Sequence, residues 1–342
     1  MNGLICGLSI LTIAIRRDFH SGMEGRQPYD FAHYYLSSKR IHNGENPNLP
    51  VANEVRDLLD FDGYKAHVAD PPGMLLIQYP IGFFSYSTSW LACALASIFV
   101  LTGSIFLVCK ELKLPLHITL GSMGLSLLSY PFQESLFYNH SEWILLVLSV
   151  LGWIFARRGK PLGGFLWGML ASAKLFPGML LVTCFTSRLW KLFAWTFLGF
   201  TIFTIAGVLL IGTNRSLDFI NLALPQSKLY YNRVGNSSLM ALGNIVTGHL
   251  WVGFILTFLG ALACLACSWK YPGNLDRVYC SGISSALILS PISWIPYGIL
   301  MFPPLIILST KINWKSIGQS CLFILLSSIM IFWPIYFHHS FD

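Results

Sequence analysis

Long apolar stretches alternate with short polar ones along most of this 342-residue chain, and this alternation predicts a bundle of membrane-spanning helices. A helix needs about 20 largely apolar residues to cross the hydrocarbon core of a bilayer. We place eleven spans, the fifth and sixth of them short, at residues 1–15, 87–109, 114–131, 142–156, 161–174, 176–187, 192–212, 249–268, 278–293, 296–310 and 316–336. The predicted fold is an all-α polytopic membrane protein with one transmembrane domain over residues 1–342.

Composition supports this fold class. Only 11% of the residues are charged, whereas 54% are hydrophobic. A soluble domain usually carries about 25% charged residues, so this chain has too few charges to cover a surface exposed to water. The formal net charge of +7 would suggest a nucleic-acid partner for a soluble protein. In a membrane protein, basic loops beside the bilayer account for it, so we expect membrane lipids as partners and no nucleic acid.

The loops between the predicted spans are of two kinds. One kind is short and basic, and these loops contain eleven Lys or Arg residues but only two acids, Glu111 and Asp276. The other kind is longer and more aromatic and, together with the C-terminal tail, holds the other 13 acidic residues. Because short basic loops mark the cytoplasmic side of a membrane, the long loops are predicted to face outward. The first of these outward loops covers residues 16–86.

This first loop contains a charged and aromatic segment, GRQPYDFAHYYLSSKRIHNGENP, at residues 25–47. Pro28 suits the first position of a helix and Asn43, followed by glycine, suits a helix end, so the segment predicts a helix. Asp30 and His33 fall on one face of it, which is typical of an amphipathic helix at the membrane interface. Two interpretations of Asp30 remain open: a solvated residue of an anchor, or a general base that deprotonates an acceptor hydroxyl.

Two further segments place ionisable side chains at the outer ends of predicted spans. His140 and Glu142 lie where ionisable groups are costly in lipid and usually functional, although a helix cap beside a solvated histidine is the alternative. Lys174 lies in an apolar stretch close to the helix-breaking Pro177. It either extends to the interface or holds a lipid-linked phosphate, because a lysine ammonium suits phosphate as a point charge.

The loop at residues 224–244 mixes cations such as Arg233 with aromatic side chains. Aromatic rings stack on sugars and cations neutralise phosphates, so the mixture suits a sugar phosphate, but it equally suits an ordinary loop at headgroup level. The sequence contains no P-loop, GxSxG or HExxH pattern. Its single Asp-x-Asp pair, at Asp60–Asp62, is short enough to arise by chance.

Five segments in order resemble glycosyltransferase family 87, membrane enzymes of the GT-C architecture that use polyprenyl-phosphate-linked sugars and include mycobacterial mannosyltransferases. The segments are DFAHYYLSSKRIHNGENPN, PPGMLLIQYPIG, GGFLWGMLASAKLFPGMLL, GNSSLMAL and SPISWIPYGILMFPPLIIL. They span nearly the whole chain. The resemblance implies a GT-C-type bundle whose first outward loop carries the catalytic helix. It is also consistent with the plasma membrane of a prokaryote, with the active face outward.

The resemblance also implies roles for individual residues. Asp30 matches the aspartate taken as the catalytic base of the family, and Lys174 matches its lysine ahead of a proline turn. Asn236 and Ser238 match its Asn-x-Ser-Leu segment. The substrate-binding set that we predict is His33, Tyr34, His140, Glu142, Lys174, Arg233, Asn236, Ser238 and Trp294.

The implied reaction moves a sugar, mannose-like, from a polyprenyl-phosphate carrier to a glycolipid or glycan acceptor with inversion at the anomeric carbon. Asp30 accepts the proton. The lipid-linked sugar is the donor, and a divalent metal is compatible with this chemistry but not required by it. The rivals are a lipid-linked sugar flippase or transporter, and an inactive subunit of a cell-envelope glycan pathway. A transporter would favour repeated halves and ionisable residues at mid-membrane. The sequence shows no internal repeat, and its predicted spans are nearly free of charge except at their outer ends.

Two departures from the family pattern keep the inactive subunit open. Family members often carry Gly-Gln-x-Asn where this chain has Asn-His-Ser-Glu at residues 139–142. They also often have histidines after the Ser-Trp that is followed here by Ile-Pro-Tyr at residues 295–297. These changes affect the expected sugar and acceptor more than the expected class of reaction.

Overall fold

The computed structural model describes residues 29–59, 70–226, 231, 236–270 and 272–332. Within these ranges the chain is helical and has no β-strand, only an isolated antiparallel bridge between Asn236 and Trp294. The predicted all-α fold class is therefore confirmed for this part of the chain. The first predicted span, residues 1–15, lies outside the described residues.

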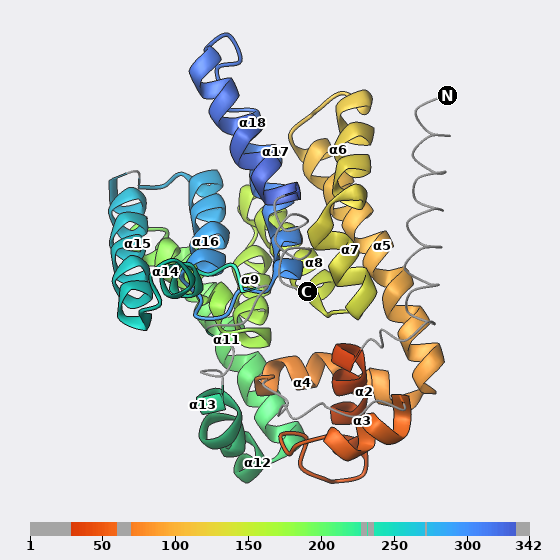
Figure 1. The fold of residues 1–342 in the computed structure, drawn as a ribbon. Helices are drawn as coiled ribbons and strands as arrows, with labels where there is room; N and C mark the ends of the chain where they lie inside the picture. Colours follow the sequence, from red (N-terminus) through yellow and green to blue (C-terminus); the bar gives the residue numbers. More distant parts are fainter. Residues whose placement is uncertain (1–28, 60–69, 227–230, 232–235, 271, 333–342) are drawn as a thin grey trace.

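The helices follow one another as shown in Figure 1. The first are α2 (Tyr29–His42), α3 (Ala52–Leu59), α4 (Pro72–Gln78) and the 3-10 helix η1 (Tyr79–Phe83). The next are α5 (Tyr86–Glu111), α6 (Leu116–Leu128), α7 (Tyr130–Tyr138), α8 (Glu142–Arg157), α9 (Leu162–Ala173), η2 (Phe176–Gly178), α10 (Met179–Thr186) and α11 (Trp190–Ile211). The last are α12 (Thr213–Asp218), η3 (Phe219–Ala223), α13 (Leu224–Gln226), α14 (Leu239–Thr247), α15 (Leu250–Lys270), α16 (Leu275–Leu289), η5 (Ile295–Met301), α17 (Phe302–Ser309) and α18 (Ile317–Phe332).

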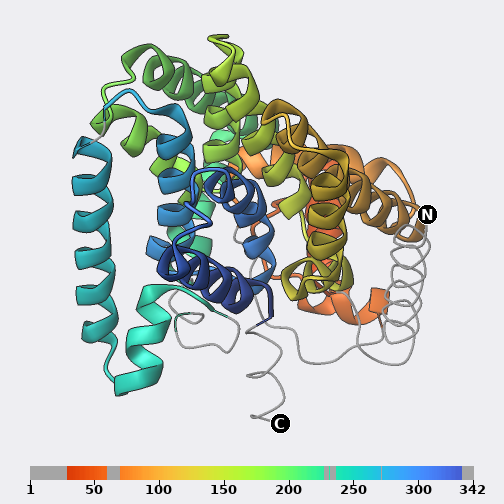
Figure 2. The same ribbon diagram turned by 90° about the horizontal axis from the view of Figure 1, so that it is seen from above.

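Three helices of the described part, α5, α11 and α15, are long and apolar enough to cross a membrane. Figure 2 shows α15 at the edge of the bundle, where it contacts α14 and α16. The other described helices are shorter, so the count of eleven is not confirmed. Two predicted spans, 176–187 and 296–310, each consist of a 3-10 helix and a short α-helix. Prolines explain the divisions because a proline lacks the N–H that an intact helix needs. Pro177 lies in η2, before α10, and Pro296 lies in η5, before α17.

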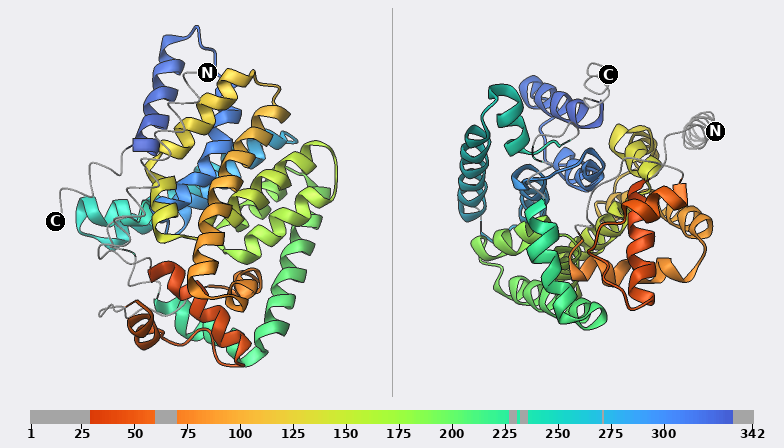
Figure 3. Two further views of the ribbon diagram at one scale, coloured as in Figure 1. Left: turned by 90° about the vertical axis from the view of Figure 1, so that its right-hand side faces the viewer. Right: turned by 60° about the horizontal axis from the view of Figure 1, so that its bottom comes forward.

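The charged residues of the short basic loops meet at one end of the bundle, which we call the basic end. Arg158 lies 2.7 Å from Glu111, Arg157 lies 3.3 Å from Asp276, and Lys311 lies 3.8 Å from Asp276. These residues come from the ends of α5, α8 and α17 and from the start of α16. At the other end, α2, α3, α4 and α12 gather in both Figure 1 and Figure 3. Among the described residues, the short basic loops and the helices of the first predicted outward loop therefore lie at opposite ends.

Small residues let α9, α11 and α4 pack closely together. A Cβ atom added to Gly168 of α9 would lie 2.2 Å from the carbonyl oxygen of Thr196 on α11. One added to Gly207 of α11 would lie 2.3 Å from the carbonyl oxygen of Pro72 on α4. Such close approach is common between membrane helices, whose association depends on van der Waals packing. It fixes the position of α4 and of the segment that leads into it.

The helix predicted in the first loop is confirmed as α2, and Gly44 follows its end with a φ of +71°. None of the described side chains of α2 is exposed, and its position at the membrane interface stays a prediction. Neighbouring elements surround it: Ser38 Oγ donates to Tyr79 O (2.7 Å) and accepts from Gly82 N (2.9 Å), while Arg40 pairs with Glu54 of α3. The polar side chains of α2 are therefore available for an internal site.

Candidate active site

Three ionisable side chains form one hydrogen-bonded row, although two of them are 110 residues apart in sequence. His140 Nε2 lies 2.8 Å from Asp30 Oδ2, and His140 Nδ1 lies 2.9 Å from Glu142 Oε1. Glu142 is buried, whereas 31% of the Asp30 side chain is exposed. Asp30 is thus the accessible end of the row, which we call the Asp30–His140–Glu142 row.

The turn between α7 and α8 directs His140 toward α2. Asn139 ends α7 in the left-handed region, with a φ of +50°, a conformation that asparagine tolerates better than most residues. Its side-chain Nδ2 donates to the carbonyl oxygen of Trp90 on α5 at 2.7 Å and so anchors the turn. Asp30 and Glu142 lie in the first turns of α2 and α8, where the positive end of a helix dipole favours a carboxylate.

The charges in the row stabilise one another against burial. Burial alone would lower the pKa of His140, but Glu142 and Asp30 outweigh it and raise this pKa to about 10. Burial alone would raise the pKa of Asp30, but His140, together with His33 and Lys174, outweighs it and the pKa of Asp30 is lowered. His33 behaves differently, because burial lowers its pKa to about 4. At neutral pH the site therefore holds an ionised Asp30, a charged His140 and a neutral His33.

A second buried pair lies within electrostatic reach of the row. Lys174 Nζ lies 2.5 Å from Asp70 Oδ1, and Gln78 Nε2 donates to Asp70 Oδ2 at 3.3 Å. Lys174 follows the last residue of α9, and Asp70 lies just before α4. The Lys174 ammonium also interacts electrostatically with Asp30 and Glu142. The row and the pair therefore form one cluster of charges.

Two tyrosines border this cluster. The ring of Tyr34 on α2 meets the ring of His140 edge-on, with centroids 6.4 Å apart. Burial and the nearby carboxylates raise the pKa of Tyr34 well above its usual value, so its phenol keeps its proton. Tyr297 of η5 is buried within electrostatic reach of Lys174. The structure thus brings Asp30, His33, Tyr34, His140, Glu142 and Lys174, all singled out from the sequence, into one site.

Comparison with known proteins identifies the family. A model of glycosyltransferase family 87 matches residues 70–291, which is more than half of the chain. The chain belongs to glycosyltransferase family 87. No curated protein and no solved structure matches it. The resemblance inferred from the five segments is confirmed, and this family 87 member is a membrane glycosyltransferase. The matched region includes Asp70, His140, Glu142 and Lys174, and it ends before Trp294.

In this family 87 member, Asn236 and Ser238 connect two loops. Asn236 Nδ2 donates to Pro291 O at 2.9 Å, and its Oδ1 accepts from Ser293 N at 2.9 Å. Ser238 is the N-cap of α14, and its hydroxyl also donates to Pro291 O at 3.2 Å. The bridge between Asn236 and Trp294 joins the same two segments. These contacts give the residues a structural role, and their role in substrate binding stays a prediction.

The sequence analysis did not select Asp70, although it is the partner of Lys174. A signal was present, because Asp70 is an acid placed directly before Pro-Pro-Gly at the start of an apolar run. A carboxylate at such a position is costly in lipid and needs a partner. Tyr297 was noted only as a departure from the family pattern. Arg233 lies outside the described residues.

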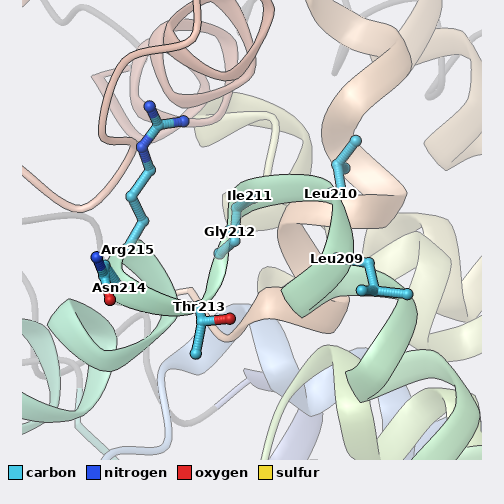
Figure 4. Close-up of a pocket in the computed structure, with 7 residues that line it drawn as sticks. All are labelled: Leu209, Leu210, Ile211, Gly212, Thr213, Asn214 and Arg215. Atoms are coloured by element: carbon cyan, nitrogen blue, oxygen red, sulfur yellow. The ribbon is translucent and has the colours of Figure 1, made fainter.

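A surface pocket of about 570 Å³ lies elsewhere in the molecule. It is lined by residues 209–215, at the junction of α11 and α12 (Figure 4). The Arg215 side chain extends from there toward the loop after α2, where it donates to Gly44 O. No residue of the Asp30–His140–Glu142 row or of the Lys174–Asp70 pair lines this pocket. Among the described residues, no three His, Cys, Asp or Glu side chains are placed to hold a metal ion.

Proposed function

We propose that this glycosyltransferase moves a sugar, mannose-like, from a polyprenyl-phosphate carrier to a hydroxyl of a glycolipid or glycan acceptor, with Asp30 as the general base. The observation that carries the proposal is the position of Asp30 as the accessible end of a buried charged row. A carboxylate held ionised by a neighbouring cation and open on one side can accept a proton from a bound hydroxyl.

The step is a single displacement with inversion. The acceptor oxygen forms a bond to the anomeric carbon as the bond between that carbon and the phosphate oxygen breaks. The electron pair of the broken bond leaves on the polyprenyl phosphate, and the hydroxyl proton passes to Asp30. Because the anomeric carbon carries positive charge in an oxocarbenium-like transition state, a weak base such as Asp30 suffices.

Lys174 is proposed to balance the charge of the departing phosphate. An ammonium group has three N–H donors, and only one is needed for the contact with Asp70 Oδ1. The remaining donors can bind phosphate oxygens, as lysine does in many phosphate sites. Arg233, in the loop at residues 224–244, is proposed to assist. His33, Tyr34, Asn236, Ser238 and Trp294 are proposed to bind the sugar or acceptor.

We further propose that the protein works in a prokaryotic plasma membrane with this site facing outward. Two observations support the proposal: the short basic loops gather at one end of the bundle, and the Asp30–His140–Glu142 row belongs to the other. Basic loops are enriched on the cytoplasmic side. A lipid-linked donor is confined to the membrane surface, where such a site can meet it.

The test is a transfer assay with the full chain in membranes. Polyprenyl-phosphate-linked mannose, arabinose and glucose are offered to a lipid extract of the host, and wild type is compared with Asp30→Asn. We expect product from the wild type with one donor and a loss of at least about 100-fold in rate for Asp30→Asn. The matched control is Asp57→Asn, which changes an exposed acid of α3 and should leave the rate unchanged.

Two results would contradict the proposal. Equal rates for wild type and Asp30→Asn would remove Asp30 from its role as the base. No product from wild type with any donor, although donor binding is retained, would favour the inactive subunit.

A further inference from the structure

His140 separates two carboxylates, Asp30 and Glu142, that would otherwise lie close together with no cation between them. Each ring nitrogen lies within hydrogen-bond distance of a different carboxylate, at 2.8 Å and 2.9 Å. An ionised carboxylate only accepts hydrogen bonds, whereas a neutral imidazole has a single N–H to donate. Both contacts can therefore be made to ionised carboxylates only when the ring carries two protons. The geometry by itself indicates an imidazolium.

The contact with His140 also distinguishes the two oxygens of Asp30. Oδ2 is engaged by His140 Nε2, while no hydrogen bond from the described residues reaches Oδ1. Glu142, at the far end of the row, is buried and also accepts a hydrogen bond from Ser135 at 3.4 Å. The row therefore has a closed end at Glu142 and an open end at Asp30 Oδ1.

We propose that His140 and Glu142 are positioning residues for the general base: His140 holds Asp30 through Oδ2 and leaves Oδ1 for the acceptor hydroxyl, and Glu142 keeps His140 in place and charged. This inference rests on the proposed role of Asp30. It differs from the substrate-binding role predicted for His140 and Glu142, because both ring nitrogens and the Glu142 carboxylate are already engaged inside the protein.

The charge of His140 has a consequence for pH dependence. A cation beside a carboxylate lowers the proton affinity of the carboxylate, so Asp30 stays ionised at lower pH than an ordinary buried aspartate. Without the cation, burial is the dominant influence and raises the pKa of Asp30. Loss of the imidazolium should therefore move the acid limb of kcat to higher pH.

Other ionisable groups face the row from the elements packed against it. They are His33 and Tyr34 of α2, Tyr138 at the end of α7, Lys174 after α9, Asp70 before α4 and Tyr297 of η5. With a pKa of about 4, His33 stays neutral above pH 5, and the phenol of Tyr34 stays protonated. Lys174 and Asp70 are held as a pair. The charge changes that reach the active site should therefore come from Asp30 and His140.

The decisive variant is His140→Gln, whose amide can still donate a hydrogen bond to Asp30 but carries no charge. We expect kcat to fall at least about 10-fold at neutral pH, the KM for the donor to stay within about twofold, and the acid limb of kcat to move up by one pH unit or more. The matched control is His249→Gln, which changes an exposed histidine outside the site and should alter none of these values.

Two kinetic results would overturn the inference. A lower kcat with an unmoved acid limb would make the row a purely structural connection between α2 and the turn before α8. A higher KM with an unchanged kcat would return His140 to substrate binding. If Asp30→Asn is itself fully active, the proposed function fails. If Asp30→Asn is inactive while His140→Gln behaves as wild type, only this inference fails.

A stability measurement covers the case in which His140→Gln does not fold. The pKa of His140 is raised to about 10 in the folded protein and is near 6.5 for an unperturbed histidine. The stabilisation from this group is thus complete below pH 6.5 and is lost as pH rises through about 10. In Glu142→Gln the folded-state pKa of His140 falls, so this stabilisation should be smaller and its loss should be complete at a lower pH than in wild type. An identical pH dependence in the two proteins would overturn the role given to Glu142.

Discussion

Lys174 and Asp70 form an ion pair between the end of α9 and the start of α4, with Nζ 2.5 Å from Oδ1. Little of either side chain reaches solvent: 14% of Lys174 is exposed and 4% of Asp70. A charge in such a position depends on its partner, because burying it alone costs several kcal/mol. A substitution of Lys174 is therefore expected to change the stability of the site as well as any role that Lys174 plays in catalysis.

We predict that Lys174→Met and Asp70→Asn behave differently alone and together. Lys174→Met leaves an unpaired carboxylate in a buried site and should destabilise the protein by about 3–5 kcal/mol. Asp70→Asn leaves an unpaired ammonium and should have a comparable cost. The double variant removes both charges and should recover most of the loss, as measured by thermal unfolding in detergent followed by tryptophan fluorescence.

The same variants separate a structural role of Lys174 from phosphate binding. If the lysine binds donor phosphate, the double variant should fold but transfer sugar at least about 10-fold more slowly. A stable double variant with full activity would contradict the phosphate role. Lys311→Met is the control, because Lys311 is exposed beside Asp276 at the basic end and should change stability by no more than about 0.5 kcal/mol.

Asn236→Ala should weaken the connection between the segment before α14 and the segment before η5. Truncation leaves the N–H of Ser293 and the carbonyl of Pro291 without this partner, which costs about 1–3 kcal/mol. Ser238→Ala removes the cap of α14 and should cost about 1 kcal/mol. Thermal unfolding measures both, and Asn214→Ala, at an exposed position, is the control. A normal donor KM in folded Asn236→Ala would contradict its predicted role in substrate binding.

Gly207→Ala should displace α4. The new methyl group would lie 2.3 Å from the carbonyl oxygen of Pro72, so one backbone must move. We expect a loss of about 1–3 kcal/mol in stability, together with a lower transfer rate because Asp70 leads directly into α4. Gly103→Ala on α5 is the control, since its Cβ would meet no atom within 4 Å. Equal behaviour of the two variants would show that the contact between α11 and α4 is loose.

The orientation of the site can be measured with cysteines placed at its two ends. In a cysteine-free background, Asn43→Cys introduces a thiol just after α2, and Lys160→Cys introduces one near the basic end; both positions are exposed. We expect a membrane-impermeant maleimide to label Asn43→Cys in intact cells and Lys160→Cys only after permeabilisation. The reverse pattern would place the site on the cytoplasmic side and would contradict the outward orientation.

Sequence signals that act on neighbouring residues, such as helix starts and ends, gave correct predictions. Pro28 and the Asn43-Gly44 pair predicted the limits of α2 to within a residue or two, because a proline and a glycine restrict the backbone where they stand. The burial of α2 side chains such as His33 was not predicted, since elements distant in sequence bury them. The number of spans is not confirmed, because segments such as residues 176–187 form a 3-10 helix at Pro177 and a short α-helix instead of one long helix.

The sequence by itself determined the class of this protein, because a chain with 11% charged residues cannot cover itself in water. It also determined the family and the grouping of basic loops. Only the tertiary structure decided that His140 bridges Asp30 and Glu142 and that Asp70, not chosen from the sequence, is the partner of Lys174. Hydrophobicity and capping act over a few residues, whereas these charges are joined across 110 and 104 residues. These charges pair because close packing of the helices brings together the helix ends that carry them.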